Sequence, residues 1–190
     1  HARVRPLLDD ARDDVALELA HLAHGLVLSR RATAADRDLA LEVLRRARDA
    51  QVRQRNLVYA TMADVRIAEL TAEAGEVRGA IESARSIVDQ LFENGEMFLR
   101  GVATAALVET LLGRGSDTDV QEATVAIERL AAVPTDPGFV LNEIPLLRLR
   151  ALLAKAHGDE TDYRDYRDRY RALATSLGFE GHMAMAEAMP

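Results

Sequence analysis

Apolar residues recur at steps of three and four along most of this chain. The clearest stripe lies within residues 76–94, where it runs from Val77 to Phe92 and is followed by Gly95. This spacing places the apolar side chains on one face of an α-helix, and a glycine directly after the last of them is typical of a helix end. Residues 76–94 are therefore predicted to form an amphipathic helix.

The same kind of stripe returns at intervals of about 40 to 43 residues. It begins again near Val120 and near Tyr163, and an earlier copy follows Thr33, which is predicted to cap its helix. Thr118, with Gln121 three residues later, has the spacing of a capping box. Each stripe is preceded by another helical pattern; these cover residues 7–28, 57–74, 96–112 and 142–157. The last of them contains Pro145, which fits a helix only within its first turn.

These paired patterns predict four helical hairpins and a cap, at residues 7–55, 57–94, 96–133, 142–178 and 179–190. A hairpin cannot bury its apolar face alone, so hairpins of this kind stack on one another. We expect an all-α fold: a single repeat domain over residues 1–190, built as a right-handed tetratricopeptide-like α-α superhelix with a short C-terminal capping helix. Residues 1–5 are expected to fray.

Two resemblances follow from particular segments. Helices that end in Ala72, Ala74 and Gly75, or in Ala154, Ala156 and Gly158, resemble the tetratricopeptide repeat superfamily. Segments 96–115, 145–154 and 163–184 resemble the extreme C-terminus of large mycobacterial proteins. In those proteins a class III adenylate or guanylate cyclase homology domain precedes a nucleotide-binding ATPase module and a helical repeat region. The resemblance implies a non-catalytic regulatory segment of a cytoplasmic signalling protein, and it implies nothing about chemistry within residues 1–190.

Charge narrows the choice of partners. The formal charge is −7, which argues against nucleic acid as a main partner. The charge is uneven, because residues 1–55 carry 11 Arg and 9 acidic residues whereas residues 56–190 are strongly acidic. The absence of cysteine excludes thiolate metal sites and cysteine nucleophiles. No apolar run is long enough to predict membrane insertion, and we expect a cytoplasmic protein.

No catalytic, cofactor-binding or metal-binding residue is predicted. Glu18 and His21 have the Glu-x-x-His spacing used by helical di-iron proteins, but such a site needs a second copy, which this chain lacks. A metal-binding helical-bundle enzyme built on this pair is therefore an alternative only. The turn at residues 113–116 lacks the Lys and hydroxyl of a phosphate-binding loop.

The predicted partner-binding residues are arginines, in two groups. One is the basic cluster that contains Arg45, Arg46 and Arg48 together with Arg53 and Arg55, interpreted either as a solvated helix face or as a docking surface for an upstream domain of the same chain. The other consists of polar residues on the first helices of hairpins, expected to line the concave face of the stack and bind a protein: Arg66, Arg100 and Arg148. A purely structural oligomerisation module is the remaining alternative, and the oligomeric state is left open.

Overall fold

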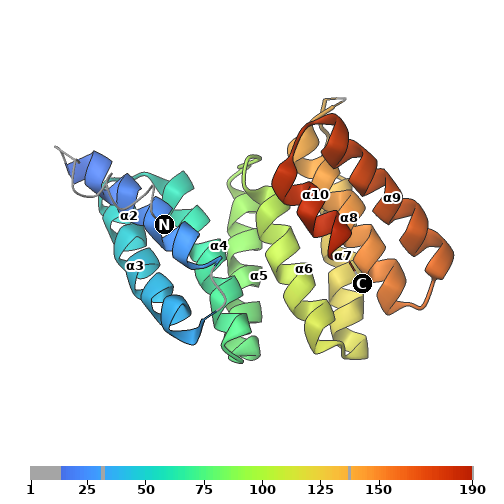
Figure 1. Cartoon of the computed structure of the whole chain (residues 1–190), viewed down its shortest axis with the longest axis horizontal. Helices are drawn as coiled ribbons and strands as arrows, with labels where there is room; N and C mark the ends of the chain where they lie inside the picture. The colour runs from blue at the N-terminus through green and yellow to red at the C-terminus, as the bar shows by residue number, and fades with distance from the viewer. Residues whose placement is uncertain (1–13, 31–32, 137, 190) are drawn as a thin grey trace. The chain divides into compact units, whose positions relative to one another are not determined.

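A computed structural model describes residues 14–30, 33–136 and 138–189, and every regular element in these ranges is an α-helix (Figure 1). The nine helices are α2 (Asp14–Leu28), α3 (Ala34–Arg53), α4 (Leu57–Glu73), α5 (Val77–Glu93), α6 (Arg100–Arg114), α7 (Asp117–Ala131), α8 (Val140–Ala156), α9 (Glu160–Ser176) and α10 (Glu180–Glu187). The all-α prediction is confirmed for this part of the chain. The expected fraying of residues 1–5, and the first seven residues of the helix predicted at 7–28, lie outside the described residues.

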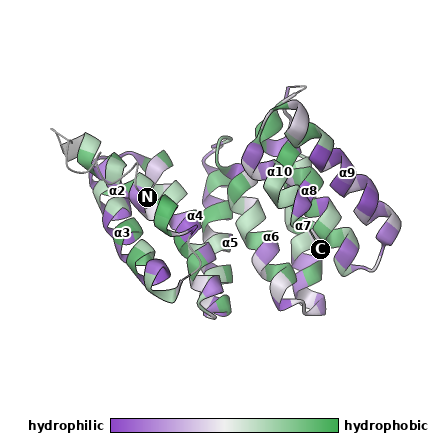
Figure 2. Cartoon of the chain, in the orientation of Figure 1, coloured by the Kyte–Doolittle hydropathy of each residue, from purple (hydrophilic) through white to green (hydrophobic). Residues whose placement is uncertain are grey.

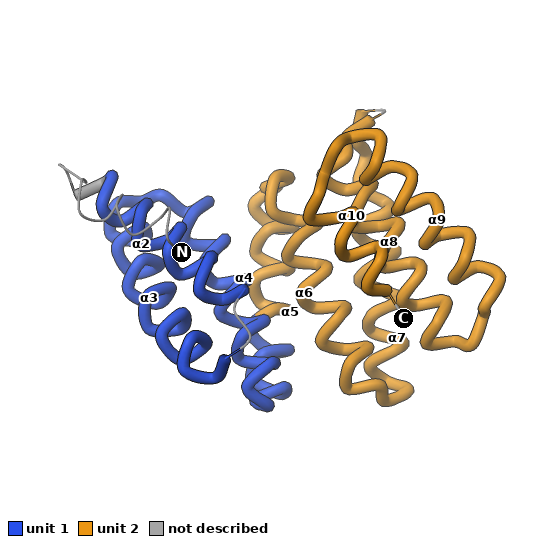
Figure 3. The backbone as a smooth tube through the Cα atoms, in the orientation of Figure 1, with its two compact units in different colours: residues 1–83 blue, residues 84–190 orange. Residues whose placement is uncertain are grey.

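The chain divides into two compact units, residues 1–83 and 84–190, with the boundary inside α5 (Figure 3). In unit 1, α3 packs against both α2 and α4, and α2 also contacts α4. In unit 2, α7 packs against α6 and α8 while α6 contacts α8, and α9 then packs between α8 and α10. Within each unit, neighbouring helices therefore pack in sequence order, and the pairs α2 with α4 and α6 with α8 are also in contact. None of the described helices combines the length and apolar character needed to cross a bilayer.

Polar contacts link equivalent helices of successive hairpins. Arg66 of α4 donates from Nε to Ser29 Oγ at the end of α2 (2.8 Å), a step of 37 residues. In unit 2, Arg85 donates from Nε to Glu122 on α7 (2.8 Å), also a step of 37, and Arg148 of α8 forms a bidentate pair with Glu109 of α6, a step of 39. These intervals are slightly shorter than the 40 to 43 residues that separate the apolar stripes in the sequence.

Helix ends follow the sequence closely, with two corrections. The glycines expected to end helices adopt left-handed φ values between 67° and 95°: Gly75, Gly95, Gly158 and Gly178. Thr33 caps α3 as predicted, since its side chain accepts from the Asp36 backbone N–H.

The capping box predicted at Thr118 and Gln121 is wrong, because the cap of α7 lies two residues earlier. The Ser116 side chain accepts from the Asp119 N–H, and the Asp119 carboxylate accepts from the Ser116 N–H (both 3.2 Å). Arg114, at the end of α6, forms a bidentate ion pair with the same carboxylate. This pairing stabilises the earlier start of the helix.

The placement of Pro145 in the first turn is also wrong. Helix α8 begins at Val140, so Pro145 is its sixth residue and stands in the second turn. Proline has no N–H to donate to the carbonyl four residues earlier, which is that of Leu141. That carbonyl lies against Gly101 of α6, where an added Cβ would collide with it. The glycine therefore allows α6 and α8 to approach closely at the point where the helix is interrupted.

Helix α10 covers the end of unit 2. Its Ala186, with Met183 and Met185 beside it, packs on a buried cluster that includes Ile144 of α8 and Tyr170 of α9. Most of α9 outside this contact is hydrophilic (Figure 2). A capping helix at residues 179–190 is thus observed as α10.

Candidate interaction surface

Unpaired basic side chains gather at the end of α3. Arg45, Arg46 and Arg53 are exposed, and so is Arg55 in the turn that follows. None of these four side chains makes a hydrogen bond or ion pair within the part of the chain that the structure describes. Asp49 is the one acidic residue among residues 45–55, and it is paired with Arg48 (2.9 Å). The positive charge of this segment is therefore not neutralised locally.

The arginines of α9 behave differently, although that helix is equally rich in arginine. Arg164 pairs with Glu160 (2.8 Å), Arg167 with Asp168 (2.9 Å), and Arg169 with Asp165 (3.2 Å). Exposed pairs of this kind contribute only ~0.2–1 kcal/mol each to stability, but they neutralise the helix surface. Helix α9 thus has the mixed-charge solvated face expected of an end unit, and the end of α3 does not.

Arg55 has a left-handed backbone conformation, with φ 58°. It is the only non-glycine residue with positive φ among the described residues. Its N–H bonds the Val52 carbonyl, and the next N–H, of Asn56, bonds the Gln51 carbonyl (2.9 Å), which is the hydrogen-bond pattern found at Gly75 in the following turn. A side chain at this position costs about 1–2 kcal/mol relative to glycine.

Exposed apolar side chains continue this surface onto α4. Leu57 is 65% exposed, and Val58 and Tyr59 are also exposed, as is Val52 near the end of α3. We call residues 45–59 the α3–α4 corner. An apolar patch next to charged groups is typical of a protein-binding surface. Sequence reasoning missed this patch, although three consecutive large apolar residues at 57–59, directly after a basic segment, were visible in the sequence.

Arg48 differs from the other arginines of the predicted cluster because it is paired with carboxylates. Its Nε donates to Asp64 on α4 (3.0 Å), so it links the two helices of the corner. Burial raises the pKa of the Asp64 carboxyl, and the charge of Arg48 offsets part of this rise. The structure thus leaves Arg45 and Arg46 exposed on α3 and places Arg48 in the α3–α4 contact.

The first-helix arginines are engaged inside their own units. Arg66 donates to the Ser29 hydroxyl and carbonyl and pairs with Glu69 (2.7 Å). Arg100 is 6% exposed; its guanidinium lies 4.4 Å from the centre of the Phe92 ring and donates to the Leu91 carbonyl. Their contribution to partner binding stays a prediction, and the structure gives both of them packing contacts.

Arg148 is the third of these arginines, and it is held by Glu109 as described above. Its charge, together with burial, lowers the pKa of His182 on α10, with burial the larger effect. The His182 Nδ1 lies 2.8 Å from the Tyr170 hydroxyl, and burial raises the pKa of Tyr170 to about 12. Tyr170 and Tyr163 are buried against α8. Arg148 therefore lies among groups that hold α10 in place.

The Glu18–His21 pair lies on α2, with His21 Nδ1 3.5 Å from Glu18 Oε2. Among residues 14–30, 33–136 and 138–189, no group of three or more His, Asp or Glu side chains is placed to hold a metal ion. The pair is therefore not joined by further ligands from the described helices. The turn at residues 113–116 connects α6 and α7, with Gly115 and Ser116 serving as helix caps.

Searches of protein-family models, curated proteins and solved structures find no significant match to this chain, so the geometry of its own residues carries the functional argument.

Proposed function

We propose that this chain is a non-catalytic protein-interaction domain that binds an acidic protein surface at the α3–α4 corner. The observation that carries the proposal is Arg55, a charged residue in a left-handed conformation that glycine adopts in six other connections between the described helices. Strained residues persist where the surroundings or function require them. Here the guanidinium has no partner inside the described chain and adds to the charge of Arg45 and Arg46.

The charged and the apolar residues of the α3–α4 corner have different roles in the proposed binding. Uncompensated arginines attract an acidic partner over distances of about 8–10 Å at physiological salt. Leu57 and Tyr59, exposed beside them, then supply apolar area that is removed from water on docking. The charge of the arginines orients the partner and speeds its association, and burial of the apolar residues slows its dissociation.

The resemblance of the C-terminal half supplies a candidate partner and context. We propose that the hairpins form a tetratricopeptide-like right-handed superhelix at the C-terminus of a cyclase-homology and ATPase signalling protein. In that setting the corner docks the nucleotide-binding ATPase module of the same chain and so regulates the linked catalytic unit. The domain itself carries out no reaction in this proposal.

Binding in trans tests the proposal. The chain is mixed with a separately produced ATPase module from the mycobacterial proteins that it resembles, and the Kd is measured by calorimetry at low and high salt. Reversing both charges, Arg45→Glu with Arg46→Glu, is expected to weaken binding by about tenfold or more and to flatten its salt dependence. Leu57→Ser is expected to raise the dissociation rate.

The matched control reverses two arginines of α9, Arg164→Glu with Arg171→Glu, which changes the net charge by the same amount. These side chains are 66% and 63% exposed and lie in unit 2, outside the corner. An equal loss of binding in both variants would mean that net charge alone drives association. That result, or the absence of any complex with the wild-type chain, would refute the docking proposal.

A further inference from the structure

Three of the five methionines in this chain lie between residues 183 and 189. Met183 and Met185 belong to α10, and Met189 follows its last turn. All three side chains are partly exposed, and all three pack on buried residues of α8 and α9. We call them the α10 methionines. They lie in unit 2 and share no residue with the α3–α4 corner.

The α10 methionines supply much of the apolar contact that holds this helix in place. Within Glu180–Glu187, Ala186 is the only buried side chain. The first two methionines lie beside it on the buried cluster that contains Tyr170, and Met189 contacts both this cluster and a second one that contains Tyr163. A helix of eight residues is too short to be stable alone, since isolated helices in water need about 12–15 residues. The position of α10 therefore depends on these contacts.

The sulfur of Met185 lies next to a polar contact between α9 and α10. The Tyr170 hydroxyl is 4.0 Å from the Met185 Sδ and 2.8 Å from the His182 Nδ1. A thioether is only a weak hydrogen-bond acceptor, so the sulfur interferes little with the contact to His182. An oxygen atom added to this sulfur would be a strong acceptor, and it would compete for the same hydroxyl.

Partial exposure leaves the α10 methionines open to a small oxidant. A short helix with one buried side chain also opens locally at low cost, which increases this access. Met97 provides a comparison, because it is 38% exposed between α5 and α6 and belongs to neither of the clusters that the α10 methionines contact. Oxidation of Met97 therefore has no packing against α8 and α9 to disturb.

We propose that the α10 methionines are a site of reversible oxidation that releases α10 from α8 and α9. The oxidant is hydrogen peroxide. A lone pair of the sulfur forms the S–O bond as the O–O bond breaks, and the proton of the transferred oxygen passes to the departing oxygen. The thioether is oxidised to a sulfoxide and the peroxide is reduced to water. The new oxygen requires hydration, which packing on the apolar clusters does not allow.

The test compares oxidised and reduced forms of the wild-type full chain. The chain is treated with hydrogen peroxide at neutral pH, the oxidised residues are identified by mass spectrometry, and backbone hydrogen exchange is measured. We expect sulfoxides at all three α10 methionines and exchange in residues 180–189 that is faster by about tenfold or more, with α6 unchanged. Methionine sulfoxide reductases of both epimer specificities are expected to restore slow exchange.

Variants separate the α10 methionines from other sites of oxidation. Replacing all three by leucine, as Met183→Leu with Met185→Leu and Met189→Leu, conserves apolar volume and removes the sulfur. Peroxide is then expected to leave exchange in α10 unchanged. Met97→Leu is the matched control, and it is expected to respond to peroxide as wild type does.

Four results would overturn the proposal. They are oxidation of the α10 methionines without faster exchange in α10, oxidation of Met97 while the α10 methionines resist, a full response in the triple leucine variant, and fast exchange that persists after the reductases have acted. The comparison of oxidised and reduced wild type does not depend on the folding of any variant. Because the α3–α4 corner does not enter this experiment, its outcome is independent of the proposed function.

Discussion

The close approach of α6 and α8 at Gly101 leads to a specific prediction. Substituting Gly101→Ala adds one methyl group to α6 at the point where the helix lies against the Leu141 carbonyl of α8. The new Cβ would collide with that carbonyl and would lie 3.1 Å from Pro145 Cγ. Neither neighbour can turn aside, because one is backbone and the other is a proline ring within the helix. The two helices must therefore move apart.

The expected magnitude is a balance of two effects. Alanine is favoured over glycine in a helix interior by about 0.5–1 kcal/mol. Overpacking of this kind typically costs about 1–3 kcal/mol, and here the obstacle is rigid. Gly101→Ala should therefore lower the free energy of unfolding by ~1–2 kcal/mol, even though it improves helix propensity.

Gly113→Ala is the matched control because Gly113 lies in the same helix and an added Cβ would meet nothing within 4 Å. It should leave stability unchanged or raise it by up to about 1 kcal/mol, less near the helix end. Urea unfolding followed by circular dichroism at 222 nm measures both variants. A Gly101→Ala variant as stable as Gly113→Ala would show that α6 and α8 do not approach as described, and the reasoning would fail.

Three further predictions concern single residues. Arg55→Gly should raise the free energy of unfolding by ~0.5–1 kcal/mol, because it removes a left-handed penalty of about 1–2 kcal/mol while the greater freedom of glycine in the unfolded chain offsets part of that gain; a lower urea midpoint would contradict this. Hydrogen bonds from Arg114 and then Ser116 hold the pKa of Asp119 well below its ordinary value of 3.8, so their stabilisation is present above about pH 4 and is lost on acidification below it. The advantage of wild type over Asp119→Asn in urea midpoint should therefore shrink as the pH falls through that range, and a constant difference would argue against it. Burial, and then the charge of Arg148, lower the pKa of His182 from 6.5, so the neutral form that faces Tyr170 stabilises α10 above about pH 6.5 and this contribution is lost as the pH falls. Protease cleavage near residues 177–182 should become faster on mild acidification in wild type and less so in His182→Gln.

Some features of the α3–α4 corner could be predicted from the sequence and others could not. Arg45 and Arg46 could be placed on an exposed helix face because helical periodicity assigns every residue of α3 a direction. The pairing of Arg48 with Asp64 could not, since it depends on a residue 16 positions away on another helix. The left-handed conformation of Arg55 was also hidden, because nothing in an arginine signals positive φ; only its place in a turn equivalent to that of Gly75 reveals it.

The sequence by itself determined where most of the described helices lie. Helical periodicity and caps are local, so the residues that form each stripe and the glycine that ends it are sufficient to locate an element to within a few residues. The polar links between successive hairpins span 37 and 39 residues, slightly less than the 40 to 43 residues that separate these patterns. Ser116 and Thr118 can each cap a helix. The ion pair between Arg114, at the end of α6, and Asp119 favours the start of α7 after Ser116.

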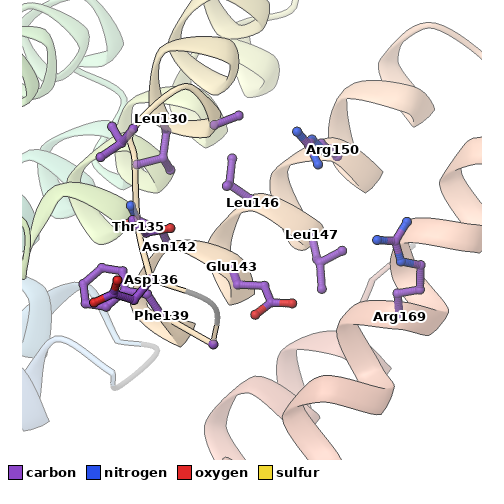
Figure 4. A pocket seen from close by; sticks show the side chains of 13 residues that line it. Leu130, Thr135, Asp136, Phe139, Asn142, Glu143, Leu146, Leu147, Arg150 and Arg169 are labelled. Atoms are coloured by element: carbon purple, nitrogen blue, oxygen red, sulfur yellow. The ribbon is translucent and has the colours of Figure 1, made fainter.

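Only the tertiary structure decided which side chains meet across helices. Gly101 is one small residue among many in the sequence, and its importance appears only when the carbonyl freed by Pro145 is found against it. A cleft lined by Leu130, Leu146 and Arg169 likewise draws residues from α7, α8 and α9 (Figure 4). Contacts of this kind depend on the rotation and separation of packed helices, which are set by the sum of many side-chain contacts and leave no periodic trace in the chain.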